Sequence, residues 1–164
     1  MSLSKKHILI SGLGSVGCRH SRNFSKLGNI ISGIDPNPER RKDSENNGII
    51  SQSYRSLLDV FSNDESKIDG VIICSPTSLH PEQIKQCLNH GLPVLTEKPL
   101  GCNLSDVDNL CKNFNHMLPY LLVGYTWRYW PALKLLRELL TKEKVGKTLF
   151  ARFFISAHLA DWHP

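Results

Sequence analysis

Three glycines near the N-terminus have the spacing that brings a main chain close to a phosphate. Gly12, Gly14 and Gly17 form the pattern G-x-G-x-x-G directly after the apolar run 7–11. The first glycine permits a tight turn, the second lets the backbone approach a pyrophosphate, and the third allows close packing of a helix on a strand. The helix that follows directs free N–H groups at the phosphates. Because any tight strand-to-helix turn favours glycine, this pattern alone is a weak signal.

An acidic residue lies where a dinucleotide-binding fold needs one. A second apolar run, residues 30–34, ends at Asp35, close to the separation of about 20 residues at which the fold places its ribose-binding acid. A carboxylate there accepts hydrogen bonds from both ribose hydroxyls. The alternative is a solvated Asp that begins the turn 35–38. Strand, glycine turn, helix, strand and acid occur in order, which favours nucleotide binding.

Chemically active residues also follow two later apolar runs, 70–74 and 93–96. After the second run, Glu97 and Lys98 are expected at the cleft, where Lys98 could donate or accept a proton. The alternative is a surface ion pair at a turn. After the run 70–74, the small residues 75–78 leave room for a cofactor. Ser78 is predicted to cap the next helix.

The elements that position these residues alternate along the chain. Strands alternating with helices require right-handed βαβ crossovers and a parallel sheet, whose strand ends share the edge where ligands bind. We therefore predict an α/β fold with a doubly wound Rossmann sheet. Apolar runs predict strands at 7–11, 30–34, 70–74, 93–96 and 120–124, and helical spacing predicts helices at 16–27, 54–61, 103–117 and around 84–91.

The pattern changes after residue 124. Residues 131–140 predict a helix that Gly146 ends, and residues 147–158 predict a long strand, because they are rich in aromatic and β-branched residues. We expect residues 1–124 to form the dinucleotide-binding domain and residues 125–164 to begin a second α/β domain for the substrate. Without a sheet of its own, the long strand could pair with a second copy of the chain.

Composition restricts the class of protein. The 164 residues are 40% hydrophobic and 21% charged, as in soluble globular proteins. No apolar run approaches the roughly 20 residues of a membrane span, and no signal-peptide region begins the chain. The five cysteines are scattered without a C-x-x-C pair, which indicates reduced cytoplasmic thiols and no metal site. The basic residues behind the net charge of +5 are dispersed, which argues against a nucleic-acid partner.

Together these motifs resemble the N-terminal part of the Gfo/Idh/MocA oxidoreductase family. Glu97-Lys98-Pro99 in this register is the most diagnostic element. The similarity covers nearly the whole chain and keeps the family's order. The residues that carry it are 12–17, Asp35, 75–80, 91–94, 97–100 and 124–129.

The resemblance implies hydride transfer between NAD(P) and the hydroxyl of a sugar, cyclitol or sugar derivative. It implies that Asp35 holds the adenosine ribose, and that the catalytic Lys98 touches both the nicotinamide ribose and the substrate hydroxyl, oriented by Glu97. The other implied cofactor contacts are Gly12, Leu13, Gly14, Ser15 and Val16 at the pyrophosphate, Ser75, Thr77 and His80 at the nicotinamide, and Arg128 at the cofactor–substrate boundary.

The cofactor is expected to be NAD, because Asp35 would repel the 2′-phosphate of NADP. Arg40 and Arg41 are close enough in sequence to leave NADP open.

Family members run to about twice this length, with a second, largely antiparallel sheet that closes the substrate pocket and usually mediates oligomerisation, which leaves a homo-oligomer open. Their catalytic Asp and His lie beyond the point at which this chain ends. We therefore expect this chain to bind nucleotide and to turn over slowly or not at all. The alternative function is a non-catalytic dinucleotide-binding module. A Rossmann-type methyltransferase would explain the glycines and Asp35 but gives no reason for Glu97-Lys98-Pro99.

Overall fold

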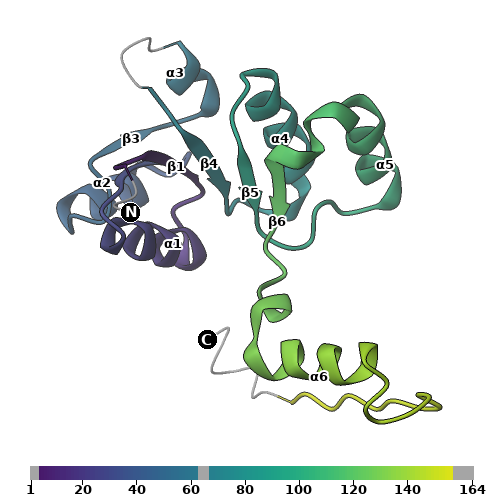
Figure 1. The fold of residues 1–164 in the computed structure, drawn as a ribbon. Coiled ribbons are helices and arrows are strands. Elements are labelled where there is room, and N and C mark those ends of the chain that lie inside the picture. The colour runs from purple at the N-terminus through teal and green to yellow at the C-terminus, as the bar shows by residue number, and fades with distance from the viewer. Residues whose placement is uncertain (1–3, 63–66, 157–164) are drawn as a thin grey trace. The chain divides into compact units, whose positions relative to one another are not determined.

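Six parallel strands form one sheet whose winding reverses between β1 and β4 (Figure 1). The computed structural model describes residues 4–62 and 67–156. The sheet order is β3-β2-β1-β4-β5-β6, with every neighbouring pair parallel, which is the order of a doubly wound Rossmann sheet. The fold class predicted from the sequence is confirmed. The strands are β1 (His7–Ser11), β2 (Ile30–Ile34), β3 (Gln52–Tyr54), β4 (Gly70–Ile73), β5 (Val94–Thr96) and β6 (Leu121–Val123).

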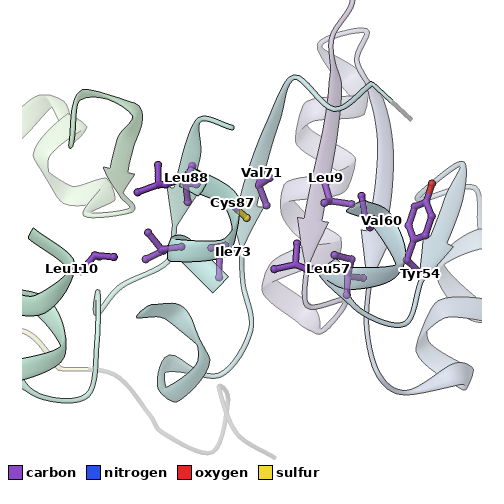
Figure 2. Close-up of a cluster of buried hydrophobic side chains, with 12 residues drawn as sticks. Leu9, Tyr54, Leu57, Val60, Val71, Ile73, Cys87, Leu88 and Leu110 are labelled. Carbon is purple, nitrogen blue, oxygen red and sulfur yellow. The ribbon is translucent and has the colours of Figure 1, made fainter. Parts of the chain in front are cut away.

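Helices pack on both faces of the sheet and produce two hydrophobic cores. Successive residues of a strand point to opposite faces, so Leu9 joins one core and Ile10 the other. The core that contains Leu9 also takes side chains from α3 (Leu57–Phe61), α4 (His80–Asn89) and α5 (Leu104–Asn113). Figure 2 shows Leu9 near Leu57 and Val60, with Leu110 at the far end of the same core. Ile10 lies in the second core, on the side of α1 (Ser15–Lys26). The strands are therefore apolar on both faces, as the continuous runs predicted.

Between β2 and α3, the chain forms the helix α2 (Pro38–Asn46) and the short edge strand β3. Arg40, Arg41 and Lys42 lie on α2, whose residues are largely exposed. Asn37 begins α2 by accepting hydrogen bonds from two N–H groups of its first turn. β3 was not predicted, because its three residues Gln-Ser-Tyr contain no apolar run.

Several boundaries differ from the sequence predictions. The helix predicted at 54–61 begins at Leu57, because Tyr54 ends β3 and Ser56 caps the helix. Ser78 does not cap α4, because it lies inside the 3-10 turn Thr77–Leu79 and the helix begins at His80. α5 ends at Asn113, and the 3-10 helix Asn115–Tyr120 occupies the rest of the predicted segment. The remaining difference is in the C-terminal part of the chain.

The chain divides into two compact units, residues 1–125 and residues 126–164. The second unit contains the 3-10 helix Thr126–Tyr129 and α6 (Pro131–Thr141). The helix ends at Thr141, before Gly146, which has a φ of +70° in the turn beyond it. Trp127 and Trp130 pack edge to face at 5.9 Å between ring centroids. No described residue of this unit is buried.

The predicted strand at 147–158 is wrong for the part that the structure describes. Residues 147–156 contain no strand, and residues 157–158 lie outside the described ranges. A strand is stable only when a neighbour satisfies its N–H and C=O groups, and no described strand pairs with this segment. Over the described ranges, no helix has the length and apolar character needed to cross a membrane.

Candidate functional site

The ends of four strands bring the predicted residues to one edge of the sheet. Ser11, the last residue of β1, is in register with Ile34 of β2 and with Ile73 of β4, and Ile73 is in register with Thr96 of β5. The residues that follow these ends therefore share the carboxyl edge, where open α/β sheets bind their ligands. They are Gly12, Asp35, Cys74 and Glu97.

The glycine turn has the conformation that its spacing predicts. Gly12 has a φ of +96°, which side chains rarely adopt, and its N–H donates to the Ile34 carbonyl at 2.8 Å. A Cβ on Gly17 would lie 1.8 Å from the Gly12 carbonyl oxygen, so α1 packs directly on the turn. At Gly14, nothing lies within 4 Å of the position that a Cβ would take. The backbone is therefore open to a ligand at Gly14.

The start of α1 is suited to an anion. Its N-cap is Gly14, without a side-chain cap, and its first turn, which begins with Ser15 and Val16, has no acidic residue. The first N–H groups of a helix have no partner within the helix, and they carry the positive end of its dipole. Together with the open space at Gly14, these amides fit the pyrophosphate of a dinucleotide.

Asp35 is tied to the glycine turn. Its side chain is buried, with the residue 3% exposed. Its Oδ2 accepts the Leu13 N–H at 2.9 Å, and its Oδ1 accepts the Asn37 N–H at 2.9 Å. Each carboxylate oxygen accepts about two hydrogen bonds, so the group retains capacity for a ribose hydroxyl.

Two arginines of α2 lie at Asp35. Arg40 Nη1 lies 3.6 Å from Asp35 Oδ2, and Arg40 is largely exposed. Arg41 Nη1 instead donates to the Asp35 carbonyl oxygen at 2.7 Å. Arg40 therefore pairs with the Asp35 carboxylate, whereas Arg41 is bound to the backbone of the same residue.

The residues after β4 are held by side-chain bridges. His80 is 1% exposed, and its two ring nitrogens lie 2.9 Å from the carbonyl oxygens of Ser75 and Pro99. The Ser75 hydroxyl donates to Gln83 Oε1 at 2.7 Å, and Thr77 is half-buried at the start of its 3-10 turn. His80 thus joins the loop after β4 to the loop after β5.

Lys98 lies on the loop after β5. The preceding Glu97 N–H donates to the Ile73 carbonyl at 2.9 Å, which fixes the loop to the end of β4. The Lys98 side chain is exposed, and within the described part of the chain its ammonium has no hydrogen bond or ion pair. The Lys98–Pro99 peptide bond is cis. The ammonium is therefore available at the edge that carries the glycine turn.

Sequence reasoning missed a contact to this loop. His20 Nε2 lies 2.9 Å from Glu97 Oε1, and both side chains are about one fifth exposed. In the sequence, His20 shares the helical spacing of Val16 and Phe24, which predicts a position on the apolar stripe of an amphipathic helix. A signal was present, because His20 comes one helical turn after Gly17, on the part of α1 that packs against the strand ends.

Cys74 is a neutral thiol within this charged edge. Burial raises the pKa of Cys74 to about 12, and the negative charge of Glu97 adds to that rise, against a smaller opposing effect of Arg19. A thiol with so high a pKa is not a nucleophile near neutral pH. Over the described ranges, no three His, Cys, Asp or Glu side chains gather as metal ligands.

Arg128 lies in the 3-10 helix Thr126–Tyr129 of the second unit, where it is exposed. Arg128 and the residues that follow the strand ends belong to different units of the chain.

Comparisons with known proteins agree with this geometry. The chain is 26% identical over 140 residues to a myo-inositol 2-dehydrogenase of Thermotoga maritima, covering 84% of this chain and 41% of that protein. It is 31% identical over 129 residues to the rhizopine catabolism protein MocA of Rhizobium meliloti, covering 77% and 39%. The chain thus spans about two fifths of the length of these curated relatives.

Solved structures and a family model complete the comparison. The crystal structure of a myo-inositol 2-dehydrogenase from Lactobacillus plantarum superposes with a TM-score of 0.78 at 26% identity, covering 88% of this chain and 43% of that one. The model of the oxidoreductase family with an NAD-binding Rossmann fold matches residues 6–125. The chain therefore belongs to the Gfo/Idh/MocA oxidoreductase family and contains its NAD-binding Rossmann domain.

Proposed function

We propose that this chain is the cofactor-binding part of an NAD-dependent oxidoreductase that acts on a hydroxyl of a sugar, cyclitol or sugar derivative. The observation that carries the proposal is the strand register, which brings the open turn at Gly14, the acid Asp35 and the loop of Lys98 to one sheet edge. The relatives named as inositol dehydrogenases support the substrate class.

Different residues of this edge bind different parts of the cofactor. The N–H groups of the turn from Gly12 to Val16 bind the pyrophosphate, and Asp35 accepts the hydroxyls of the adenosine ribose. Ser75 and Thr77 line the nicotinamide side. His80 holds the Ser75 and Pro99 carbonyls in place around it. We assign Arg128 to the boundary between cofactor and substrate on the family resemblance.

Lys98 is the proposed catalytic residue. A bound nicotinamide would supply the hydride acceptor. As the neutral amine, Lys98 would take the proton from the substrate hydroxyl while the hydride of the adjacent carbon passed to the nicotinamide, and the resulting ammonium would return the proton in the reverse reaction. Glu97 orients the loop that carries Lys98.

The proposed cofactor is NAD rather than NADP. The buried Asp35 carboxylate would repel a 2′-phosphate, and its amide contacts hold it in place. The test is titration of Asp35→Ser with NADH and with NADPH, followed by fluorescence. The ratio of the dissociation constants for NADPH and NADH should be smaller in this variant than in the unmodified chain. Tighter binding of NADPH by the unmodified chain would contradict the assignment.

We further propose that residues 1–124 are the dinucleotide-binding domain, that residues 125–164 begin the substrate domain, and that the whole protein is cytoplasmic; the family resemblance leaves a homo-oligomer open. The five free cysteines support a reducing compartment.

The test is NADH binding measured beside turnover of inositols by this chain. Binding without turnover is expected. Robust turnover would show that the chain is catalytically complete, and absence of binding would overturn the proposed function. If the full-length protein also binds NADH without turnover, the alternative of a non-catalytic dinucleotide-binding module is correct.

A further inference from the structure

A side chain of the phosphate-binding helix reaches the loop of Lys98. His20, in the second turn of α1, meets Glu97 across the sheet edge, with 2.9 Å between His20 Nε2 and Glu97 Oε1. Both side chains are mostly buried. Water therefore competes weakly for this contact, and a charge-assisted hydrogen bond at this distance has a defined geometry.

The same carboxylate continues to Lys98. Glu97 Oε2 accepts the Lys98 N–H at 3.4 Å, while Glu97 Oε1 is held by His20. Gly124, which follows β6, lies beside this carboxylate, because a Cβ added there would come 3.6 Å from Glu97 Oε2. The carboxylate thus connects α1 to the backbone of Lys98.

The Lys98 ammonium has no partner of its own within the described ranges. Its position consequently depends on the backbone of its loop. We propose that His20 is a positioning residue for Lys98, which it holds at the cofactor edge through the carboxylate of Glu97. The proposal rests on the role of Lys98 proposed above, and it makes a residue of the pyrophosphate-binding helix part of the nicotinamide end of the site.

The first test needs no cofactor. Hydrogen exchange followed by NMR in the free chain should show the Glu97 and Lys98 amides at least about threefold less protected in His20→Leu. His20→Gln, whose amide can reach the same carboxylate, should keep most of the protection, and His20→Asn, one methylene shorter, should lose it. His116→Leu, an exposed histidine in the 3-10 helix Asn115–Tyr120, is the control.

The second test is a double-mutant cycle on NADH affinity. Lys98→Met should weaken NADH binding about tenfold in the unmodified chain but only about twofold in His20→Leu, because the ammonium is then no longer held in place. A His20 that merely stabilises the fold, or touches the phosphates directly, gives an unchanged Lys98→Met effect. If His20→Leu does not fold, the same cycle is made with His20→Asn against His20→Gln.

The outcomes are distinct. The proposal is supported if the effect of Lys98→Met on NADH affinity shrinks in His20→Leu but not in His20→Gln, and if His20→Leu also loses protection of the Glu97 and Lys98 amides. Equal Lys98→Met effects in both backgrounds, or unchanged amide protection in His20→Leu, overturns it. Absence of NADH binding by the unmodified chain would overturn the proposed function itself, and the amide measurement would still decide whether His20 orders the Lys98 loop.

Discussion

The two halves of the carboxyl edge are held in place by different kinds of contact. On the β1–β2 side, backbone N–H groups of the glycine turn donate, Gly12 to the Ile34 carbonyl and Leu13 to the Asp35 carboxylate. On the β4–β5 side, side chains bridge separate loops, as His80 does between Ser75 and Pro99. A substitution that breaks the contacts of the first side therefore disturbs the fold together with the site. On the second side, it changes mainly where the loops lie.

The largest expected effect is at Gly17. Gly17→Ala should destabilise the chain by about 3 kcal/mol or more, because its Cβ would meet the Gly12 carbonyl oxygen at 1.8 Å and backbone atoms cannot easily move away. Urea unfolding followed by circular dichroism measures the loss. A stability equal to that of the unmodified chain would show that the turn is not packed as described.

The matched substitution is Gly14→Ala. No atom lies within 4 Å of its Cβ position, and its φ of −71° suits alanine, so stability should change by less than about 0.5 kcal/mol. NADH affinity should nevertheless fall about tenfold, because the methyl group occupies the space proposed for the pyrophosphate. Unchanged NADH affinity would separate Gly14 from the cofactor.

Asp35→Ala tests the contacts between β2 and the glycine turn. The buried carboxylate satisfies the amides of Leu13 and Asn37, and its loss should cost about 2 kcal/mol of unfolding free energy, because buried donors lose their acceptor. Thermal unfolding without cofactor measures the effect. Asp35→Asn keeps one carbonyl acceptor and should cost less. Equal costs for the two variants would contradict this reading of the contacts.

Ser75→Ala is the counterpart on the β4–β5 side and should cost less. Its hydroxyl donates to Gln83 Oε1 at 2.7 Å, and that oxygen also accepts from Ser11 at 3.2 Å. Because Gln83 keeps a partner, the expected loss is about 1 kcal/mol or less. Urea unfolding of Ser75→Ala beside Asp35→Ala compares the two sides directly. A larger cost for Ser75→Ala would reverse the comparison.

The smallest effect should come from the opposite, amino edge of the sheet. Burial lowers the pKa of His7 below its usual 6.5, so the unfolded chain binds more protons near that pH, and stability should fall as the pH drops below about 6.5. His7→Gln should flatten the dependence between about pH 5 and 7 in thermal unfolding. NADH affinity at neutral pH should stay the same, since His7 lies at the edge away from the glycine turn.

The sequence predicted one side of the site better than the other. Glycine spacing and the strand run before Asp35 are local patterns, and each reports a backbone requirement that a few consecutive residues satisfy. The bridge from His20 to Glu97 joins positions 77 residues apart. No local sequence pattern contains both residues of this contact. His20 therefore looks like an ordinary helix residue in the sequence, although it contacts the Lys98 loop.

In the C-terminal segment, a local sequence pattern predicted an element that the described residues do not form. Aromatic and β-branched residues predicted a strand at 147–158, but residues 147–156 adopt none. The sequence alone determined the α/β alternation and the glycine turn, because periodicity and glycine conformation act over short stretches of chain. Tertiary structure decided which loops are bridged and which apolar segment becomes a strand, because both need a partner from elsewhere in the chain.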